Sequence, residues 1–168
     1  MDGFRSAAVL VPLIYDTGGW QLLFTRRTET VQSHKGQVSF PGGGAEPGDL
    51  SPEDTALREA YEEIGLASHD VTLFKRLPYM KTISNFVITP VLARIPWPYT
   101  FLLSQEEVTR VFTIPLAWLA DGKNWEERPY RRSNGKVENV IFYRLYDGET
   151  LWGITARITL DLLAILMG

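Results

Sequence analysis

The stretch that decides the fold runs from Phe40 to Leu66, FPGGGAEPGDLSPEDTALREAYEEIGL. A glycine-rich turn opens it, and a helix follows whose two ends can be read from the letters. Ser51 is a good N-cap, and Pro52 suits the first helical position because its missing N–H would have no intrahelical acceptor. Gly65 supplies the left-handed residue that commonly ends a helix. The sequence therefore predicts a helix from about Pro52 to Ile64.

The predicted helix has two different faces. Apolar residues at i, i+3, i+4 and i+7 form one stripe that should face the core, namely Leu57, Ala60, Tyr61 and Ile64. At roughly 100° per residue, Glu59, Glu62 and Glu63 share a sector about 100° wide on the other side. Such like charges repel, whereas Mg²⁺ or Mn²⁺ would turn the repulsion into binding because it takes oxygen ligands. A lone E-x-x-E-E is ordinarily a solvated helix face, so the surrounding spacing has to decide.

That surrounding spacing resembles the signature of the Nudix hydrolases, G-x5-E-x7-R-E-U-x-E-E-x-G-U with U aliphatic. The matching positions are Gly44, Arg58-Glu59, Glu62-Glu63 and Gly65-Leu66. One position departs from the signature, because Leu50 stands where the family has its first Glu, with Asp49 beside it. The resemblance implies the Nudix fold, an α/β (α+β) architecture in which an αβα sandwich contains a central mixed β-sheet. It also implies a site for Mg²⁺ or Mn²⁺.

A second motif lies just upstream, LLFTRRTETVQSHKGQVSFPGG from Leu22 to Gly43. It is similar to the extra motif of the coenzyme A pyrophosphatase branch of the Nudix family, roughly L-L-T-x-R-S, a basic residue, then G-x-x-x-F-P-G-G. Thr28 replaces the Ser, and Gln32 stands where the branch often has Arg. This resemblance implies a small-molecule substrate, coenzyme A or a derivative, cleaved at its diphosphate to 3′,5′-ADP and 4′-phosphopantetheine. The residues expected to contact it are Arg26, Arg27, Lys35, Gln37, Gly42 and Gly43.

The implied reaction is hydrolysis of a phosphoanhydride, which needs charge neutralisation, an in-line water and a base, but no covalent enzyme intermediate. The resemblance assigns the metal to Glu59, Glu62 and Glu63, helped by a backbone carbonyl at Gly43. Arg58 is expected to orient a ligand carboxylate through a fork-shaped ion pair. Two residues qualify as the base by their chemistry, Glu62 and Glu107. Glu107 begins the pattern E-V-x-x-V-F-x-x-P-L, which is similar to a segment of the same branch.

Two alternatives to a coenzyme A diphosphatase stay open. The first is a Nudix pyrophosphatase for another nucleoside diphosphate derivative, such as ADP-ribose, NADH or an oxidised nucleotide. The second is a catalytically silent sensor that binds a nucleotide. The presence of all three glutamates argues against the sensor, because a pure binder gains nothing from a repulsive carboxylate cluster.

Composition sets further bounds. With 168 residues, 45% of them hydrophobic and 22% charged, the chain is expected to form a single domain, 1–168. A formal net charge of −3 argues against broad nucleic-acid binding, and the absence of cysteine excludes disulfides and thiolate chemistry. We find no signal peptide and no apolar stretch long enough to span a bilayer, so we expect a cytoplasmic protein without a membrane partner. A homodimer is an open option.

The remaining elements follow from hydrophobic patterns and turn residues. Ala7–Tyr15 and Trp20–Thr25 predict an opening hairpin in which Pro12 should lie at an edge or a bulge. Further strands are expected at Val71–Leu77 and Phe86–Ile95, a short helix through Leu119, a β-meander from about Tyr130 to Trp152, and a closing helix at Thr155–Met167. The Trp and Tyr residues of the meander are interpreted as packing groups rather than as platforms for stacking a base.

Overall fold

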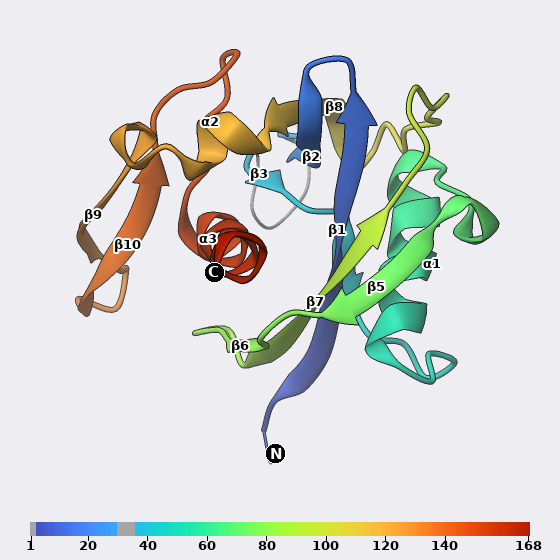
Figure 1. Ribbon diagram of the computed structural model, residues 1–168. Coiled ribbons are helices and arrows are strands. Elements are labelled where there is room, and N and C mark those ends of the chain that lie inside the picture. The colour runs from blue at the N-terminus through green and yellow to red at the C-terminus, as the bar shows by residue number, and fades with distance from the viewer. Residues whose placement is uncertain (1–2, 30–35) are drawn as a thin grey trace.

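The computed structural model describes residues 3–29 and 36–168 (Figure 1). Its larger sheet has eight strands within this part of the chain, with the main path β3-β2-β1-β7-β5, while β4 pairs with β1, β6 with β7 and β8 with β2. The sheet is mixed, because β1 and β7 are parallel and the other pairs are antiparallel. Its strands are β1 (Arg5–Asp16), β2 (Gly19–Arg27), β3 (Val38–Ser39), β4 (Gly42–Gly44), β5 (Thr72–Arg76), β6 (Met80–Lys81), β7 (Phe86–Arg94) and β8 (Val108–Pro115).

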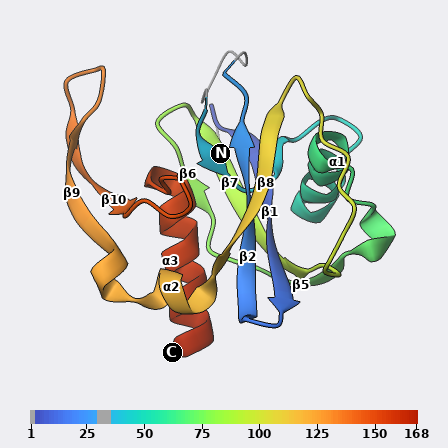
Figure 2. The same cartoon turned by 90° about the horizontal axis from the view of Figure 1, so that it is seen from above.

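The helices cover both faces of this sheet. They are α1 (Pro52–Ile64), α2 (Leu116–Ala120) and α3 (Gly153–Met167), with short 3-10 turns at Ser68–Asp70 and Gly122–Asn124. Figures 1 and 2 show α1 on one side of the sheet and α2 with α3 on the other. The expected αβα sandwich around a mixed sheet is therefore confirmed. Each interface has its own core, one joining Leu23 to Ala60 on the α1 side and one joining Phe24 to Leu162 on the α3 side.

The opening hairpin forms as predicted, with Leu13 opposite Leu22 and Tyr15 opposite Trp20. Its strands are continuously apolar because both faces of the sheet are covered. The expectation that Pro12 lies at an edge or a bulge is wrong, since β1 is a central strand and Pro12 stands opposite Ala93 of β7. Pro12 is tolerated where β1 changes partners on its other side, between residues 7–9, which pair with β4, and residues 13–16, which pair with β2.

Helix α1 begins and ends at the predicted residues. The Ser51 hydroxyl accepts a hydrogen bond from the backbone N–H of Asp54 at 3.1 Å, and Gly65 adopts the left-handed conformation with φ 69°. The predicted apolar stripe is only partly right, because Tyr61 is 63% exposed. The helix packs on the sheet through Ala56, Ala60 and Ile64 instead, which all have no exposed surface. Contact through small side chains rotates the helix so that Glu63 faces inward.

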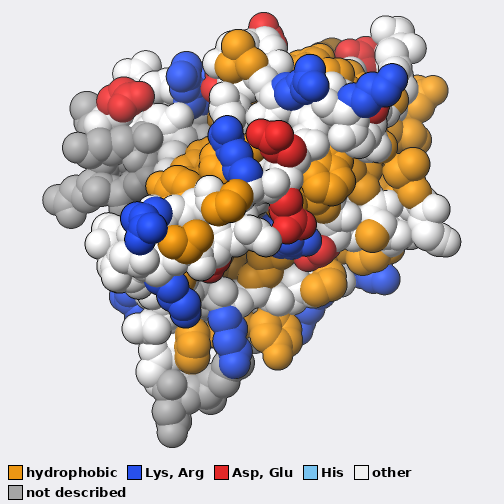
Figure 3. Space-filling model, turned by 90° about the vertical axis from the view of Figure 1, so that its left-hand side faces the viewer, with side chains coloured by type: hydrophobic (Ala, Val, Ile, Leu, Met, Phe, Trp, Pro, Cys, Tyr) orange, Lys and Arg blue, Asp and Glu red, His pale blue; other side chains and the backbone are white. Residues whose placement is uncertain are grey.

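The C-terminal part adds a separate hairpin, β9 (Trp125–Arg131) and β10 (Val137–Tyr143), joined through the predicted Asn134-Gly135 turn. On one face of it Phe142 stacks on Trp152, with ring centroids 5.4 Å apart, and the Arg128 guanidinium lies 3.9 Å from the Phe142 centroid. Figure 3 shows this side of the molecule, where basic, acidic and apolar side chains are interspersed. Among the residues described, no helix is both long and apolar enough to cross a bilayer.

Candidate active site

The glycine turn lies against the sheet and α1 at very short range. A Cβ atom on Gly42 would come within 2.4 Å of the Ala8 carbonyl oxygen. A Cβ atom on Gly43 would lie 2.7 Å from the carboxyl carbon of Glu59. A side chain on Gly42 would therefore push the turn away from the backbone of β1, whereas a side chain on Gly43 would displace the Glu59 carboxylate.

Glu59, Glu62 and Glu63 differ sharply in exposure. Glu63 is 3% exposed, while the side chains of Glu59 and Glu62 are 17% and 51% exposed. Both carboxylate oxygens of Glu63 lie 3.4 Å from the backbone N–H of Gly42, which donates to them. Within residues 3–29 and 36–168, no three acidic or histidine side chains converge closely enough to form a ready-made cation cage. Arg58 stands between two of the glutamates, with Nη1 3.0 Å from Glu59 and 3.2 Å from Glu62.

Burial makes two carboxylates of this site hold their protons more firmly than usual. The pKa of Glu63 is raised to about 8, mainly by burial and also by the charges of Glu59 and Glu107, against the opposing effects of the Gly42 N–H and Arg27. Burial also raises the pKa of Glu59, and the charges of Glu62 and Glu107 act in the same direction. Burial thus outweighs the opposing effect of Arg58 on the pKa of Glu59 and that of Arg27 on the pKa of Glu63. Carboxylate oxygens are the ligands that hard divalent cations take, so the chemistry of these side chains fits such a cation.

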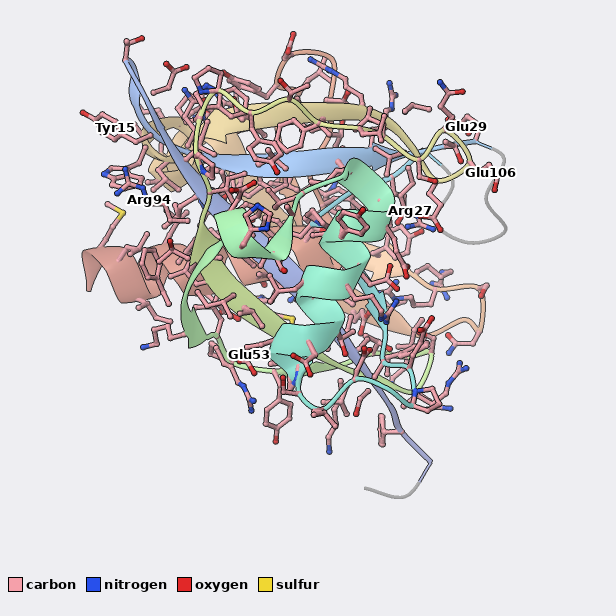
Figure 4. All side chains as sticks on the ribbon, turned by 90° about the vertical axis from the view of Figure 1, so that its right-hand side faces the viewer. Tyr15, Arg27, Glu29, Glu53, Arg94 and Glu106 are labelled. Atoms are coloured by element: carbon pink, nitrogen blue, oxygen red, sulfur yellow. The ribbon has the colours of Figure 1, made fainter. Side chains whose placement is uncertain are left out.

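Arg27 ends strand β2 on the side of the sheet that α1 covers, and its charge acts on Glu63. Its Nε is buried and has no hydrogen-bond acceptor among the described residues. The backbone N–H of Arg27 donates to the carbonyl of Gln37 at 2.9 Å, so Gln37 lies beside it. Figure 4 shows Arg27 near Glu29 and Glu106, at the end of the molecule opposite Tyr15 and Arg94. A buried guanidinium N–H without an acceptor among the described residues suits an anionic ligand.

Arg26 is not brought to this side. Its Nε lies 3.5 Å from the buried carboxylate of Glu149 instead. The same carboxylate accepts a hydrogen bond from Arg110 at 2.7 Å. Lys35, like Gln32, lies outside the described residues.

Glu107 precedes β8 in a loop that is tied to α1. The backbone N–H of Ser104 donates to the carbonyl of Glu63 at 2.8 Å, and that of Thr28 donates to the carbonyl of Glu107 at 3.0 Å. Because the Glu107 charge raises the pKa of both Glu59 and Glu63, its carboxylate is close enough to act on them. The structure therefore brings together Arg27, Gly42, Gly43, Arg58, Glu59, Glu62, Glu63 and Glu107.

Asp49 is the residue of this site to which the sequence assigned no role. The structure leaves its neighbour Leu50 90% exposed, whereas the Asp49 side chain is 7% exposed and bonded to Arg58. The Arg58 guanidinium holds the pKa of Asp49 well below its usual range. The sequence contains a sign of this role. Asp49 stands directly before Leu50, the position that departs from the Nudix signature, and nine residues before Arg58.

Comparison with known proteins agrees with this arrangement. Residues 4–131 match the NUDIX domain family. A protein named Uncharacterized Nudix hydrolase NudL from Photorhabdus laumondii is 36% identical over 157 residues, which cover 94% of this chain and 82% of that protein. A protein of the same name from Yersinia enterocolitica is also 36% identical, over 90% of this chain and 76% of its own.

Solved structures share the fold at lower identity. The Nudix hydrolase RenU from M. smegmatis aligns with a TM-score of 0.65 and 19% identity over 99% of this chain and 88% of its own. The NUDIX domain of Shewanella oneidensis NrtR, solved in complex with ADP ribose, aligns with a TM-score of 0.52 and 19% identity over 70% of this chain and 76% of its own.

A mixed sheet between two helical layers, with the glutamates of one helix packed on a glycine turn, defines a Nudix domain. The chain belongs to the Nudix hydrolase family, whose enzymes act on pyrophosphate bonds of nucleoside diphosphate derivatives and generally use divalent cations.

Proposed function

We propose that this Nudix hydrolase is a coenzyme A diphosphatase. With Mg²⁺ or Mn²⁺ it hydrolyses the diphosphate linkage of coenzyme A, or of its derivatives, to 3′,5′-ADP and 4′-phosphopantetheine. The observation that carries the proposal is the continuous motif from Leu22 to Gly43, which supplies both Arg27 and the glycine turn beside the glutamates. Its resemblance to the coenzyme A branch therefore concerns residues at the site itself.

In the proposed site, Glu59, Glu62 and Glu63 hold the cation together with the carbonyl of Gly43. When bound, such a cation neutralises charge on the diphosphate and makes water more acidic. Arg27 is assigned to the diphosphate because its buried Nε has no acceptor among the described residues. Gln37, whose carbonyl accepts from the Arg27 N–H, and the N–H of Gly42 are assigned to the same substrate, and Lys35 stays a proposal from the sequence. Arg26 is not included, because its side chain pairs with Glu149.

Two carboxylates are candidates for the base that takes a proton from the attacking water. Glu62 is 51% exposed, and its carboxylate lies 3.2 Å from Nη1 of Arg58. Glu107 lies across the site on a loop and acts on Glu59 and Glu63 through its charge. Replacing each with Gln separates them, because removal of the base abolishes the acidic limb of the pH–rate profile.

An open pocket beside Glu107 favours coenzyme A over smaller nucleotides. It has a volume of about 430 Å³ and is lined by Leu102, Leu103, Gln105, Val108 and Thr109. The pantetheine arm combines apolar carbons with two amide groups, and this lining combines apolar side chains with two polar ones. ADP-ribose has no comparable arm, so only coenzyme A would use the pocket.

The test is mass spectrometry of the products formed from coenzyme A with Mg²⁺ or Mn²⁺, with Glu63→Gln in parallel. We expect 4′-phosphopantetheine from the natural protein and a loss of several orders of magnitude in the variant. Leu102→Asp should raise the KM for coenzyme A without changing that for ADP-ribose, and Leu50→Asp is the control for adding a charge at an exposed leucine.

Other outcomes point to the alternatives. Intact coenzyme A with both metals, together with cleavage of ADP-ribose, NADH or an oxidised nucleotide, would contradict the proposed substrate. Calorimetry that detects nucleotide binding without any turnover would instead support a silent sensor.

We also propose that 1–168 form one domain. Helix α3 lies beyond the matched residues 4–131, yet its Ile158 and Leu162 share a core with Phe24 of the sheet. Removal of 153–168 should therefore prevent cooperative unfolding of the remainder, and a sharp transition in the shortened chain would contradict the proposal.

A further inference from the structure

The Arg58 side chain connects three parts of the proposed metal site. Its Nη1 donates to Glu59 at 3.0 Å and to Glu62 at 3.2 Å, and its Nη2 donates to the carbonyl of Gly44 at 3.0 Å. One planar group thus fixes two carboxylates relative to the glycine turn. A free arginine side chain has many rotamers, so something must hold the guanidinium in this orientation.

Asp49 holds it from the other side. Its Oδ1 lies 3.1 Å from the Nε of Arg58, and its Oδ2 lies 2.9 Å from Nη2. The carboxylate is itself fixed, because Oδ2 accepts hydrogen bonds from the Thr55 hydroxyl at 2.9 Å and from the backbone N–H of Glu46 at 2.9 Å. Two parallel bonds between a carboxylate and a guanidinium fix the plane of the guanidinium as well as its position.

The neighbouring residue cannot do the same. The backbone N–H of Leu50 donates to the Asp54 carboxylate at 3.0 Å, and the Leu50 side chain is 90% exposed. A side chain at position 50 therefore points to solvent, away from Arg58. In this chain the loop turns so that position 49 faces the guanidinium.

We infer that Asp49 is a positioning residue that fixes Arg58 and, through it, the carboxylates of Glu59 and Glu62 and the carbonyl of Gly44. The role rests on the metal site of the proposed function but not on the identity of the substrate. Its consequence is that the affinity for the divalent cation depends on a carboxylate that does not itself contact the cation.

The test is Asp49→Asn, which keeps the size of the side chain and an acceptor for Thr55 but removes the charge. We expect the affinity for Mn²⁺, measured by calorimetry or electron paramagnetic resonance without substrate, to fall by about 10- to 100-fold, as for other groups that orient metal ligands. Asp54→Asn is the matched control, because it lies in the same region and does not bond to Arg58. An unchanged Mn²⁺ affinity in Asp49→Asn would overturn the inference.

A double-mutant cycle separates positioning from general support of the loop. In an Arg58→Ala background, Asp49→Asn should cause no further loss of Mn²⁺ affinity, because its effect passes through the missing arginine. Additive losses would overturn the inference. Leu50→Glu combined with Asp49→Asn should not restore the affinity, and recovery would show that position 50 also reaches Arg58.

The same measurements distinguish this inference from the proposed function. If Mn²⁺ binds the natural protein and Asp49→Asn weakens that binding, but coenzyme A stays intact, only the proposed substrate is rejected. A natural protein that binds no Mn²⁺ would reject the metal site and the role of Asp49 together.

Discussion

The two faces of the sheet are built in different ways. The core on the α3 side contains buried aromatic rings, and among the residues described, the buried part of the α1-side core includes none. Phe24 stacks on Phe40 and Phe112 with centroids 4.8 and 5.9 Å apart. On the α1 side, the helix contributes Ala56 and Ala60, both fully buried. The small side chains let α1 approach the sheet closely enough to bury Glu63.

This difference separates stability from chemistry. Large apolar groups contribute most to the free energy of folding, and the α3 side has most of them. Burying a carboxylate opposes folding unless it is paired, and the α1 side accepts that cost at Glu63. The proposed active site lies on the side of the sheet where folding stability alone would favour an apolar residue in place of Glu63.

The largest expected effect is on catalysis. Glu63→Gln should lower kcat/KM for coenzyme A by about 10³-fold or more, roughly 4 kcal/mol of transition-state stabilisation, because a ligand of the proposed metal is lost. The same variant should be more stable than the natural protein without metal at pH 8, since an amide carries no charge to bury. Steady-state kinetics and urea unfolding in EDTA measure the two effects, and a loss of both activity and stability would contradict the contrast between the faces.

On the opposite face, Phe24→Ala should lower the free energy of unfolding by about 3–5 kcal/mol, because it leaves a cavity among stacked rings. Tyr61→Ala on the exposed side of α1 is the control and should change stability by less than about 0.5 kcal/mol. Urea unfolding measures both variants. Equal effects of the two would show that the α3 side is not the main source of stability.

The pH dependence of the metal-free protein should reveal the buried carboxylate. The pKa of Glu63 is about 8 in the folded state, against 4.5 for an ordinary Glu. Between pH 4.5 and 8 the folded state therefore holds a proton on Glu63 that the unfolded state has lost. Stability should therefore fall as pH rises from about 5 to 8, by at most about 4–5 kcal/mol, and Glu59 acts in the same direction.

Glu53 and Asp49, whose pKa values are also shifted, do not change the dependence of stability on pH between about 5 and 8. Their pKa values are lowered, so the stability they contribute is already complete above about pH 5. Thermal unfolding in EDTA at several pH values gives the slope, which Glu63→Gln should flatten. An unchanged slope in that variant would assign the effect to another group.

A smaller effect is expected from the glycine turn. In Gly43→Ala the new methyl group would displace the Glu59 carboxylate, so the affinity for Mn²⁺ should fall by about 10- to 100-fold. Gly122→Ala is the matched control, because its Cβ would meet no atom within 4 Å. Calorimetry compares the two, and equal affinities would show that the turn has room to move.

The smallest effect concerns the start of α1. Ser51→Ala removes the acceptor for the Asp54 N–H and should cost about 1 kcal/mol of stability. Ser68→Ala, at an exposed serine outside α1 whose side chain makes no capping bond among the described residues, should leave stability nearly unchanged. If the cap also changed Mn²⁺ affinity by more than threefold, the end of the helix would be coupled to the site.

Local chemistry explains what the sequence predicted well. The ends of α1 depend on Ser51, Pro52 and Gly65, which act on their own backbone within one turn, so the bounds were right. The opening hairpin likewise followed from a turn between two apolar runs. The spacing of the glutamates along one helix indicated a shared face before any tertiary contact was known.

Tertiary packing decided the rest. The side of α1 that is buried depends on how closely the helix can approach the sheet. The small residues Ala56 and Ala60 are buried there, and Tyr61 is left exposed. Arg26 pairs with Glu149 while the charge of Arg27 acts on Glu63, and only the tertiary structure shows which of the two arginines faces the glutamates of α1. The path of the loop before α1 made Asp49, not Leu50, the partner of Arg58. The sequence by itself determined the helix and the chemistry that its residues can perform, because these depend on near neighbours. Only the tertiary structure decided which groups meet, because that depends on contacts between segments far apart in the chain.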